Sequence, residues 1–193
     1  MRKLSYSVAA SLDGFIGDPG GDAEFGMKFV NGDYLDYHRT EAVDALPTAA
    51  RTAFGVDAAA NTVYDTIIQG RHSYDLALAI GITSPYAHLR QLVASRSLAE
   101  SPDPAVEIVS GDLAARVREL KREEGLGIYL CGGADIAGQL RDEVDELVIK
   151  TYPVVLGSGM PMFAADFRVD EFALGPVRSF DNGVMVRTYR RVR

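Results

Sequence analysis

The sequence contains a single cysteine, no long apolar run and no excess of basic residues. One cysteine, Cys131, excludes an intramolecular disulfide and is compatible with a reducing cytosol. No apolar stretch approaches the ~20 residues of a membrane-spanning helix, and the N-terminus lacks a signal-peptide pattern. The net charge is −7, whereas general nucleic-acid binding uses a basic surface. We therefore expect a cytoplasmic protein that binds neither membranes nor nucleic acids.

The sequence also lacks a metal-binding pattern. His38 and His88 do not have the spacing of metal ligands, and Cys131 has no Cys or His partner in the sequence. We expect no metal site, with both histidines at the surface and Cys131 packed as a small hydrophobic residue.

Charge is distributed unevenly along the chain. Between Asp13 and Pro47 there are eight acidic residues, against only Lys28 and Arg39. A solvated acidic helix face is one interpretation. The other is that this segment lines a site that disfavours anionic substrates.

Length and composition indicate a single domain over residues 1–193. A chain of 193 residues with 47% hydrophobic side chains buries roughly 70% of its unfolded surface. No stretch rich in Pro, Gly and Ser is long enough to act as a linker between two domains.

Short apolar strands alternate with helical segments through most of the chain. Asp112 is suited to cap a helix in which Leu113, Val117 and Leu120 form one apolar stripe, and Asp181-Asn-Gly183 is a strong hairpin signal. We expect strands at 4–10, 66–69, 91–94, 106–109, 128–131, 146–152, 172–180 and 184–192, and helices at 32–46, 113–125 and 134–141. This order predicts an α/β three-layer sandwich with a mostly parallel central sheet and an antiparallel C-terminal hairpin.

Three of the expected strands end in residues that suit phosphate. Gly70-Arg-His-Ser73 and Gly132-Gly-Ala134 each join a strand to a helix, where backbone N–H groups can bind an anion. Ser95-Arg-Ser97 repeats the combination of guanidinium and hydroxyl. Each signal alone is weak, because paired glycines also serve tight packing and arginines are common at surfaces. Since the G-x-G-x-x-G pattern is absent, the standard Rossmann fingerprint is excluded.

The chain resembles the dihydrofolate reductase-like superfamily. Within it, the chain is similar to the branch that contains the reductase domain of bacterial riboflavin biosynthesis, the RibD C-terminal domain. The resemblance extends from the first strand to the final hairpin and is thin between Asp22 and Thr62. The motifs that carry it are Ser11-Leu-Asp-Gly-Phe-Ile-Gly17, Gly70-Arg-His-Ser-Tyr74, Leu130-Cys-Gly-Gly-Ala134, Asp145-Glu-Leu147 and Pro153-Val-Val-Leu-Gly-Ser-Gly-Met-Pro-Met-Phe163.

The resemblance implies NADPH as the hydride donor and, in addition, a homodimer. The loop Leu12–Gly17 would cover the nicotinamide, and backbone groups of Ala9 and Ile16 would hold its carboxamide. The remaining cofactor residues would divide into three groups. The pyrophosphate and adenosine ribose would be bound by Gly70, Arg71, His72 and Ser73. The 2′-phosphate side would be bound by Ser95 and Arg96. The segment that passes beneath the pyrophosphate would be Gly132, Gly133, Ala134 and Asp135, with an unusual peptide geometry between the two glycines.

The proton donor and the substrate are less well defined. In dihydrofolate reductase an acid on the helix after the nicotinamide loop contacts the pterin, and the matching region here contains Asp33 and Asp36. Either is a candidate catalytic residue, with a solvated helix position as the alternative for both. Asp13 lies in the covering loop, where it could instead shape the turn.

We expect a small, pterin- or pyrimidine-like substrate. Reduction of 5-amino-6-(5-phosphoribosylamino)uracil in riboflavin biosynthesis is an alternative, although the acidic Asp13–Pro47 segment counts against a ribosyl phosphate unless Arg51 or Arg168 reaches it. A non-catalytic nucleotide-binding or scaffold protein of the same fold is the alternative outside the enzymes.

Overall fold

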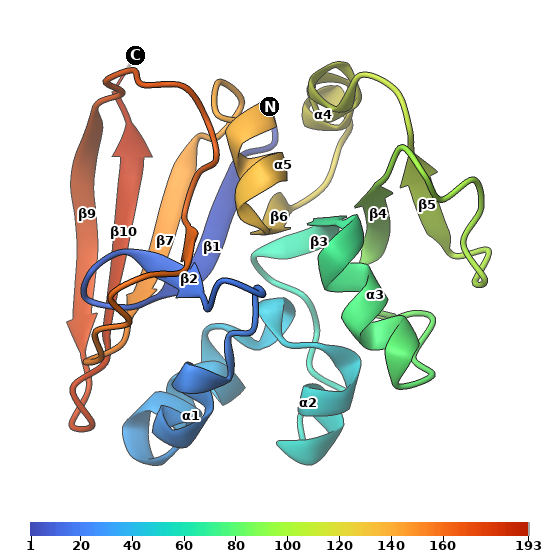
Figure 1. Cartoon of the computed structure of the whole chain (residues 1–193). Helices are drawn as coiled ribbons and strands as arrows, with labels where there is room; N and C mark the ends of the chain where they lie inside the picture. The colour runs from blue at the N-terminus through green and yellow to red at the C-terminus, as the bar shows by residue number, and fades with distance from the viewer. Residues whose placement is uncertain (193) are drawn as a thin grey trace.

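The computed structural model describes residues 1–192. Its centre is an eight-stranded sheet in the order β5-β4-β3-β6-β1-β7-β10-β9 (Figure 1). The strands of this sheet are β1 (Leu4–Ala10), β3 (Tyr64–Gly70), β4 (Arg90–Ala94), β5 (Val106–Val109), β6 (Gly127–Gly132), β7 (Glu146–Thr151), β9 (Phe172–Ser179) and β10 (Met185–Arg191). The first six run parallel, whereas β10 and β9 form an antiparallel hairpin on β7. The predicted fold class is therefore confirmed.

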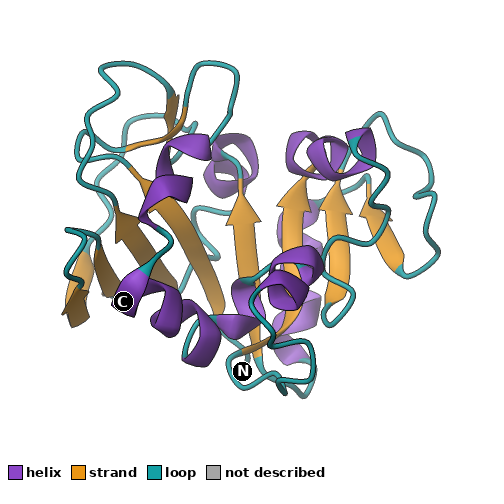
Figure 2. Cartoon of the chain, turned by 90° about the horizontal axis from the view of Figure 1, so that it is seen from below, coloured by secondary structure: helices purple, strands orange, loops and turns teal. Residues whose placement is uncertain are grey.

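Helices cover both faces of the sheet (Figure 2). They are α1 (Gly32–Thr40), α2 (Thr48–Ala53), α3 (Arg71–Ala79), α4 (Leu113–Arg122) and α5 (Ala134–Gln139). Helices α4 and α5 pack on one side, which we call the α4–α5 face, and α1 and α3 pack on the other, the α1 face.

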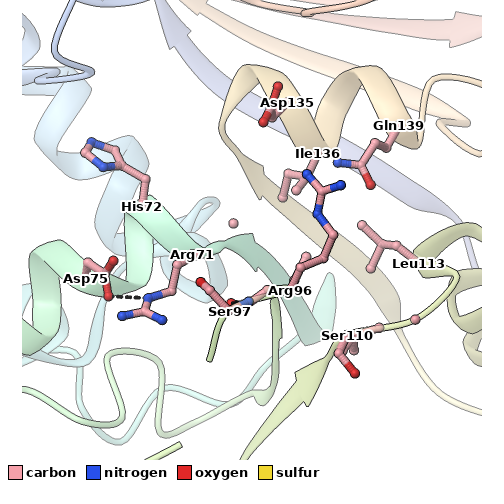
Figure 3. Close-up of a pocket in the computed structure, with 15 residues that line it drawn as sticks. Arg71, His72, Asp75, Arg96, Ser97, Ser110, Leu113, Asp135, Ile136 and Gln139 are labelled. Atoms are coloured by element: carbon pink, nitrogen blue, oxygen red, sulfur yellow. Dashed lines mark hydrogen bonds and ion pairs between the residues drawn. The ribbon is translucent and has the colours of Figure 1, made fainter. Parts of the chain in front are cut away.

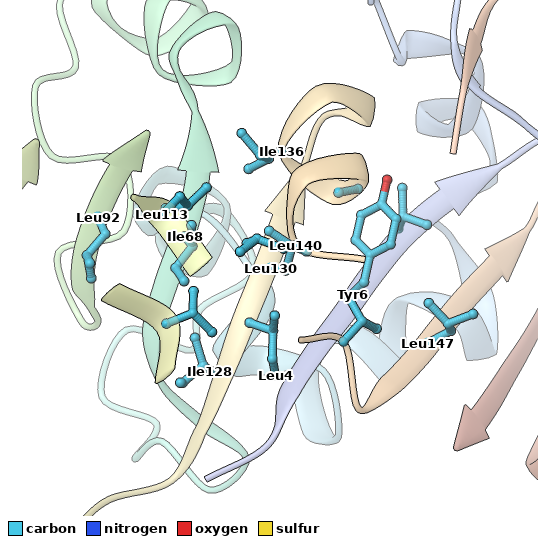
Figure 4. Packing of buried hydrophobic residues seen from close by; sticks show 14 of the residues in the cluster. Leu4, Tyr6, Ile68, Leu92, Leu113, Ile128, Leu130, Ile136, Leu140 and Leu147 are labelled. Atoms are coloured by element: carbon cyan, nitrogen blue, oxygen red, sulfur yellow. The ribbon is translucent and has the colours of Figure 1, made fainter. Parts of the chain in front are cut away.

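The main hydrophobic core lies on the α4–α5 face (Figure 4). Tyr6, Ile68 and Leu130 come from three adjacent strands and are 0% exposed. The stripe Leu113, Val117 and Leu120 of α4 packs against them. As predicted, the Asp112 carboxylate accepts a hydrogen bond from the Ala115 N–H and caps this helix. Because each such side chain contributes about 1.5–3 kcal/mol when fully buried, this face supplies much of the stability.

The predicted strands are confirmed with small shifts of their ends, and the helices are shorter than predicted. The helix expected over 32–46 ends at Thr40, and a 3-10 turn, Val43–Ala45, replaces its last part. Two strands were not predicted, β2 (Phe15–Gly17) and β8 (Met160–Pro161), which pair with each other in a separate small sheet. Strands of three and two residues are too short to produce a periodic pattern.

Candidate functional site

A cavity of about 750 Å³ opens at the carboxyl ends of β3, β4 and β5. The starts of α3 and α5 form two of its walls (Figure 3). It is lined by Gly70, Arg71, His72, Asp75, Ala94, Ser95, Arg96, Ser97, Val109, Ser110, Gly111, Leu113, Asp135, Ile136 and Gln139. This is the edge at which open α/β sheets bind their ligands.

The cavity brings together six of the residues predicted from sequence to bind a cofactor. They are Gly70, Arg71, His72, Ser95, Arg96 and Asp135. Gly132, Gly133 and Ala134 lie beside it, whereas Ser73 is half-buried in the first turn of α3 and is not part of its lining. Three separate stretches of sequence therefore meet at one place.

Glycines keep the backbone accessible behind this cavity. A methyl group at Gly70 would lie 3.5 Å from the Gly132 carbonyl oxygen and 3.7 Å from the Gly133 nitrogen. Gly132 has a φ of +114°, a conformation that favours glycine, and it is joined to Gly133 by a cis peptide bond. The peptide geometry expected between these glycines is thus present. Two strand ends, β3 and β6, approach each other here without intervening side chains.

The two arginines of the cavity have different environments. The Arg71 Nε lies 2.5 Å from Asp75 Oδ1, one helical turn further along α3 (Figure 3). Arg96 is exposed, and within residues 1–192 no carboxylate lies within 4.0 Å of it. Arg96 therefore offers the uncompensated positive charge that an additional phosphate needs.

Serines play two roles at this edge. The Ser95 hydroxyl accepts hydrogen bonds from the N–H groups of Ser97 (3.3 Å) and Leu98 (2.9 Å), so it holds the turn that presents Arg96. Ser110 and Gly111 line the cavity after β5 but were not predicted as site residues. The signal that identifies them is the same polar, glycine-containing junction between strand and helix seen at Gly70 and Gly132.

The loop that connects β1 to β2, which is predicted to cover the nicotinamide, is fixed by Asp13. The Asp13 carboxylate accepts hydrogen bonds from the N–H groups of Leu156 (3.1 Å) and Gly157 (2.7 Å). A hydrogen bond from the Ser11 hydroxyl, together with these N–H groups, lowers the pKa of Asp13 to about 2. Asp13 therefore shapes this loop, and Ile16 that follows is 8% exposed in β2.

The next loop approaches the first turn of α3. A side-chain carbon at Gly21 would lie only 3.0 Å from His72 Nε2 and 2.9 Å from the terminal methyl of Met160. The glycine thus allows this loop to pass close to His72, one of the predicted cofactor residues. Ala9, the other residue predicted to hold the carboxamide, lies near the end of β1, where its Cα is paired with that of Lys150 in β7.

The two candidate proton donors face other parts of the molecule. Asp33 Oδ2 accepts a hydrogen bond from the Asp181 N–H in the β9–β10 turn (3.3 Å). Asp36 is exposed, and its carboxylate lies 3.9 Å from Arg39. In these positions Asp33 stabilises the contact between α1 and the hairpin, and Asp36 corresponds to the solvated helix position.

The arginines considered for a substrate phosphate are also engaged elsewhere. Arg51 is 2% exposed and donates to the carbonyl oxygens of Val43 and Ala59. Arg168 pairs with Asp142 and Asp170. Neither arginine lines the cavity, so neither supports a phosphorylated substrate there.

The two histidines expected at the surface are half-buried. His38 packs edge-on against Tyr34, with ring centroids 4.6 Å apart, and its Nδ1 is buried. His88 Nε2 lies 3.0 Å from the Asp44 carbonyl oxygen, and its Nδ1 is buried too. Both rings are structural members of the α1 face and its loops.

Among residues 1–192, none of the helices has the length and apolarity needed to span a bilayer.

The order of strands and the cavity at their carboxyl ends define a dihydrofolate reductase-like α/β protein. Within that class the chain belongs to the RibD C-terminal domain family, whose sequence profile matches residues 2–186. Domains of this family are reductases that generally use NAD(P)H.

Individual relatives agree with this assignment. The chain is 27% identical to the uncharacterized protein YwjB of Bacillus subtilis (strain 168), over 98% of each chain. It is similar in structure to a putative riboflavin biosynthesis protein from Shewanella sp. PV-4, with a TM-score of 0.76, 24% identity and 99% of each chain covered. It also resembles the dihydrofolate reductase of Enterococcus faecalis, solved with NADP(H) and RAB-propyl, with a TM-score of 0.60, 16% identity, and 99% and 97% of the two chains covered.

Proposed function

We propose that this protein is an NADPH-dependent reductase that transfers a hydride to a small heterocyclic substrate of the pterin or pyrimidine type. The observation that carries the proposal is the convergence of Gly70, Arg71, Ser95 and Arg96 on one cavity. Two guanidinium groups beside serine hydroxyls suit a dinucleotide with an additional phosphate, and so favour NADPH over NADH. Membership of a reductase family supports the same assignment.

The residues at the strand ends fit such a cofactor in size and chemistry. A cavity of about 750 Å³ lies within the range of about 300–1,000 Å³ that is usual for small-molecule sites. We assign the pyrophosphate to Gly70–Ser73 and to the backbone of Gly132–Asp135. Arg96 and the Ser95 turn would bind the 2′-phosphate, because Arg96 has no competing carboxylate within 4.0 Å among residues 1–192.

When bound, NADPH would supply the hydride. The chain would orient the nicotinamide through backbone groups of Ala9 and Ile16, at the end of β1 and in β2. The loop held by Asp13 would cover this end and exclude water, which strengthens every electrostatic interaction in the site. Asp13 is suited to this task since its carboxylate joins the loop to the N–H groups of Leu156 and Gly157.

The cofactor assignment is tested by calorimetric titration of the protein with NADPH and NADH. We expect Arg96→Ala to weaken NADPH binding about 10- to 100-fold, the loss of one charge-assisted interaction of about 1.5–3 kcal/mol. Binding of NADH should change little in this variant. Arg122→Ala is the matched control, because Arg122 is exposed on α4 and does not line the cavity.

Two results would contradict the proposal in different ways. Absence of NADPH binding to the wild-type protein at millimolar concentration would remove the cofactor assignment altogether. Binding of NADPH without oxidation by any pterin, pyrimidine or carbonyl compound would favour the alternative, a non-catalytic nucleotide-binding protein.

We also propose that two copies associate through the C-terminal hairpin. Strand β9 is an edge strand of the sheet, and its side chains Leu174 and Val177 are 61% and 50% exposed. Apolar edge strands of this kind can pair with a second chain. Light scattering should then give a mass near twice 20.9 kDa, and a monomeric mass at micromolar concentration would contradict the association.

A further inference from the structure

A lysine lies on the α1 face, beside the predicted nicotinamide position. Lys150 is in β7, and its Cα is paired with that of Ala9 across the parallel ladder. Its Nζ lies 3.4 Å from the Ser7 hydroxyl, its only hydrogen-bond partner among residues 1–192. Within the same residues no carboxylate lies within 4.0 Å of this Nζ. The chain itself therefore leaves most of the hydrogen-bonding capacity of this ammonium unused.

The groups around Lys150 are neutral or weakly acidic. Cys131 of β6 and His38 of α1 are the titratable groups that interact with it. Loss of water lowers the pKa of Lys150, and the Cys131 thiol acts in the opposite sense. His38 is also neutral near pH 7, because burial and Lys150 lower its pKa to about 4. Its Nδ1 is buried without a hydrogen-bond partner.

This part of the α1 face is partly exposed although it lies at the centre of the sheet. Ala9, Cys131 and Lys150 come from three adjacent strands and are all partly exposed. On the opposite face of the same strands, Tyr6 and Leu130 are 0% exposed and Leu147 is 8% exposed. A small molecule bound on the α1 side would therefore contact the Lys150 side chain and the end of β1 together.

The strand order places this lysine at the end of the path proposed for the cofactor. The phosphate-binding residues follow β4 and β3, and the path continues past the end of β6 to β1. From β4 to β1 this is three strand spacings, about 14 Å. Lys150 is on β7, the next strand, so it flanks the position where the hydride would be delivered.

We propose that Lys150 is a catalytic residue that holds the oxygen of a conjugated carbonyl substrate and donates a proton to it. This rests on the proposed reductase function and adds the substrate class. With NADPH bound, the C–H bond at the nicotinamide C4 would break and its hydride would form a C–H bond at the carbonyl carbon or at the conjugated carbon of the substrate, so that the π electrons would move to the oxygen. Lys150 transfers a proton from Nζ to that oxygen and is reprotonated from solvent. The sum is substrate, NADPH and one proton giving reduced substrate and NADP⁺.

The same geometry disfavours substrates that bind as cations. A protonated pterin or diaminopyrimidine needs a carboxylate opposite it, but Asp33 and Asp36 are directed to the hairpin turn and to Arg39. An ammonium that has no carboxylate within 4.0 Å among residues 1–192 instead attracts a carbonyl oxygen or an anion. Lys150 thus selects neutral or anionic carbonyl compounds.

The experiment compares Lys150→Met, Lys150→Arg and the wild-type protein, with Lys3→Met as the control. Lys3 is at the opposite end of β1, 55% exposed and paired with Glu146. The probe is menadione, a conjugated quinone, and NADPH oxidation is measured at 340 nm. We expect Lys150→Met to lower kcat/KM at least 100-fold while the Kd of NADPH stays within twofold. Lys3→Met should match the wild type.

The pH profile distinguishes proton donation from a structural role. In the wild type, kcat/KM should fall as pH rises through the pKa of Lys150, which is lowered from the usual value for lysine. Lys150→Arg should retain part of the activity, and this alkaline decline should move upward, because a guanidinium stays charged. An unchanged alkaline decline in Lys150→Arg would overturn the assignment.

A binding measurement covers the case in which menadione is not reduced. Lysines methylated with ¹³C are observed by NMR in the NADP⁺-loaded protein, and the Lys150 signal is assigned by its loss in Lys150→Met. Menadione should shift the Lys150 signal and leave that of Lys3 unchanged. A Lys150 signal that does not move, or a raised Kd of NADPH in Lys150→Met, would overturn the proposal. NADPH binding that persists in the wild type would leave the cofactor assignment standing.

Discussion

The two faces of the central sheet differ sharply along the same strands. On β6, Leu130 points into the α4–α5 face and is 0% exposed, whereas its neighbour Cys131 is partly exposed on the α1 face. On β1, Tyr6 is buried among apolar side chains and Ser7 faces Lys150. At this part of the sheet the α4–α5 face is packed with apolar groups. The α1 face, which carries apolar clusters elsewhere, has polar groups here, at the proposed end of the cofactor path.

This difference indicates how the protein separates stability from function. In a close-packed interior, removal of a single methylene lowers the free energy of unfolding. A face with partly exposed polar groups has less to lose and can accept a ligand. We therefore expect substitutions on the two faces to have distinct signatures, one in the free energy of unfolding and the other in catalysis and pH dependence.

The largest expected effect is on the α4–α5 face. Leu130→Ala removes a fully buried side chain from the main core and should lower the free energy of unfolding by about 2–5 kcal/mol. The loss should be the same at pH 7 and pH 5, since the deleted groups do not titrate. Urea denaturation at both pH values measures it.

Cys131→Ala, the next residue on the same strand, is the matched control. Its thiol is a small group on the partly exposed α1 face, so the loss should be under about 1 kcal/mol. Equal losses for Leu130→Ala and Cys131→Ala would contradict the contrast between the faces.

Sequence reasoning predicts the packed face better than the open one. The stripe Leu113, Val117 and Leu120 and the alternation in β1 depend on neighbours along the chain, where helical and strand periods are visible. The glycine and arginine residues at the strand ends are similarly local, because each follows its own strand directly. For this reason the fold and much of the phosphate side were predictable.

The α1 face depends on contacts between distant segments. Lys150 donates a hydrogen bond to Ser7, which is 143 residues away in the sequence. Arg51, which is buried in a segment for which the sequence predicts no strand or helix, donates to the Val43 carbonyl oxygen. The sequence predicts a surface position for His38, because its neighbours along the chain do not indicate its contacts with Tyr34 and Lys150. Strands as short as β2 and β8 also have no pattern of their own. These features appear only when the tertiary structure is known.

The smaller expected effect is the contribution of His38, on the α1 face, to the free energy of unfolding, and it depends on pH. Burial, followed by the charge of Lys150, lowers the pKa of His38 to about 4 from its ordinary 6.5. The unfolded chain therefore binds a proton at this residue before the folded protein does, and stability is lost as pH falls from 6.5 toward 4. Between pH 7 and pH 5 the contribution of His38 is about 2 kcal/mol.

His38→Phe keeps an aromatic ring against Tyr34 and removes the titrating group. The fall in the free energy of unfolding between pH 7 and pH 5 should become smaller by about 2 kcal/mol than in the wild type. His88, whose pKa burial also lowers, is present in both proteins and cancels in the difference. Lys150→Met supplies the second arm, because removal of the neighbouring charge should raise the pKa of His38 and reduce the same fall in part. If neither substitution changes the pH dependence, burial and the charge of Lys150 do not lower the pKa of His38 in the folded protein.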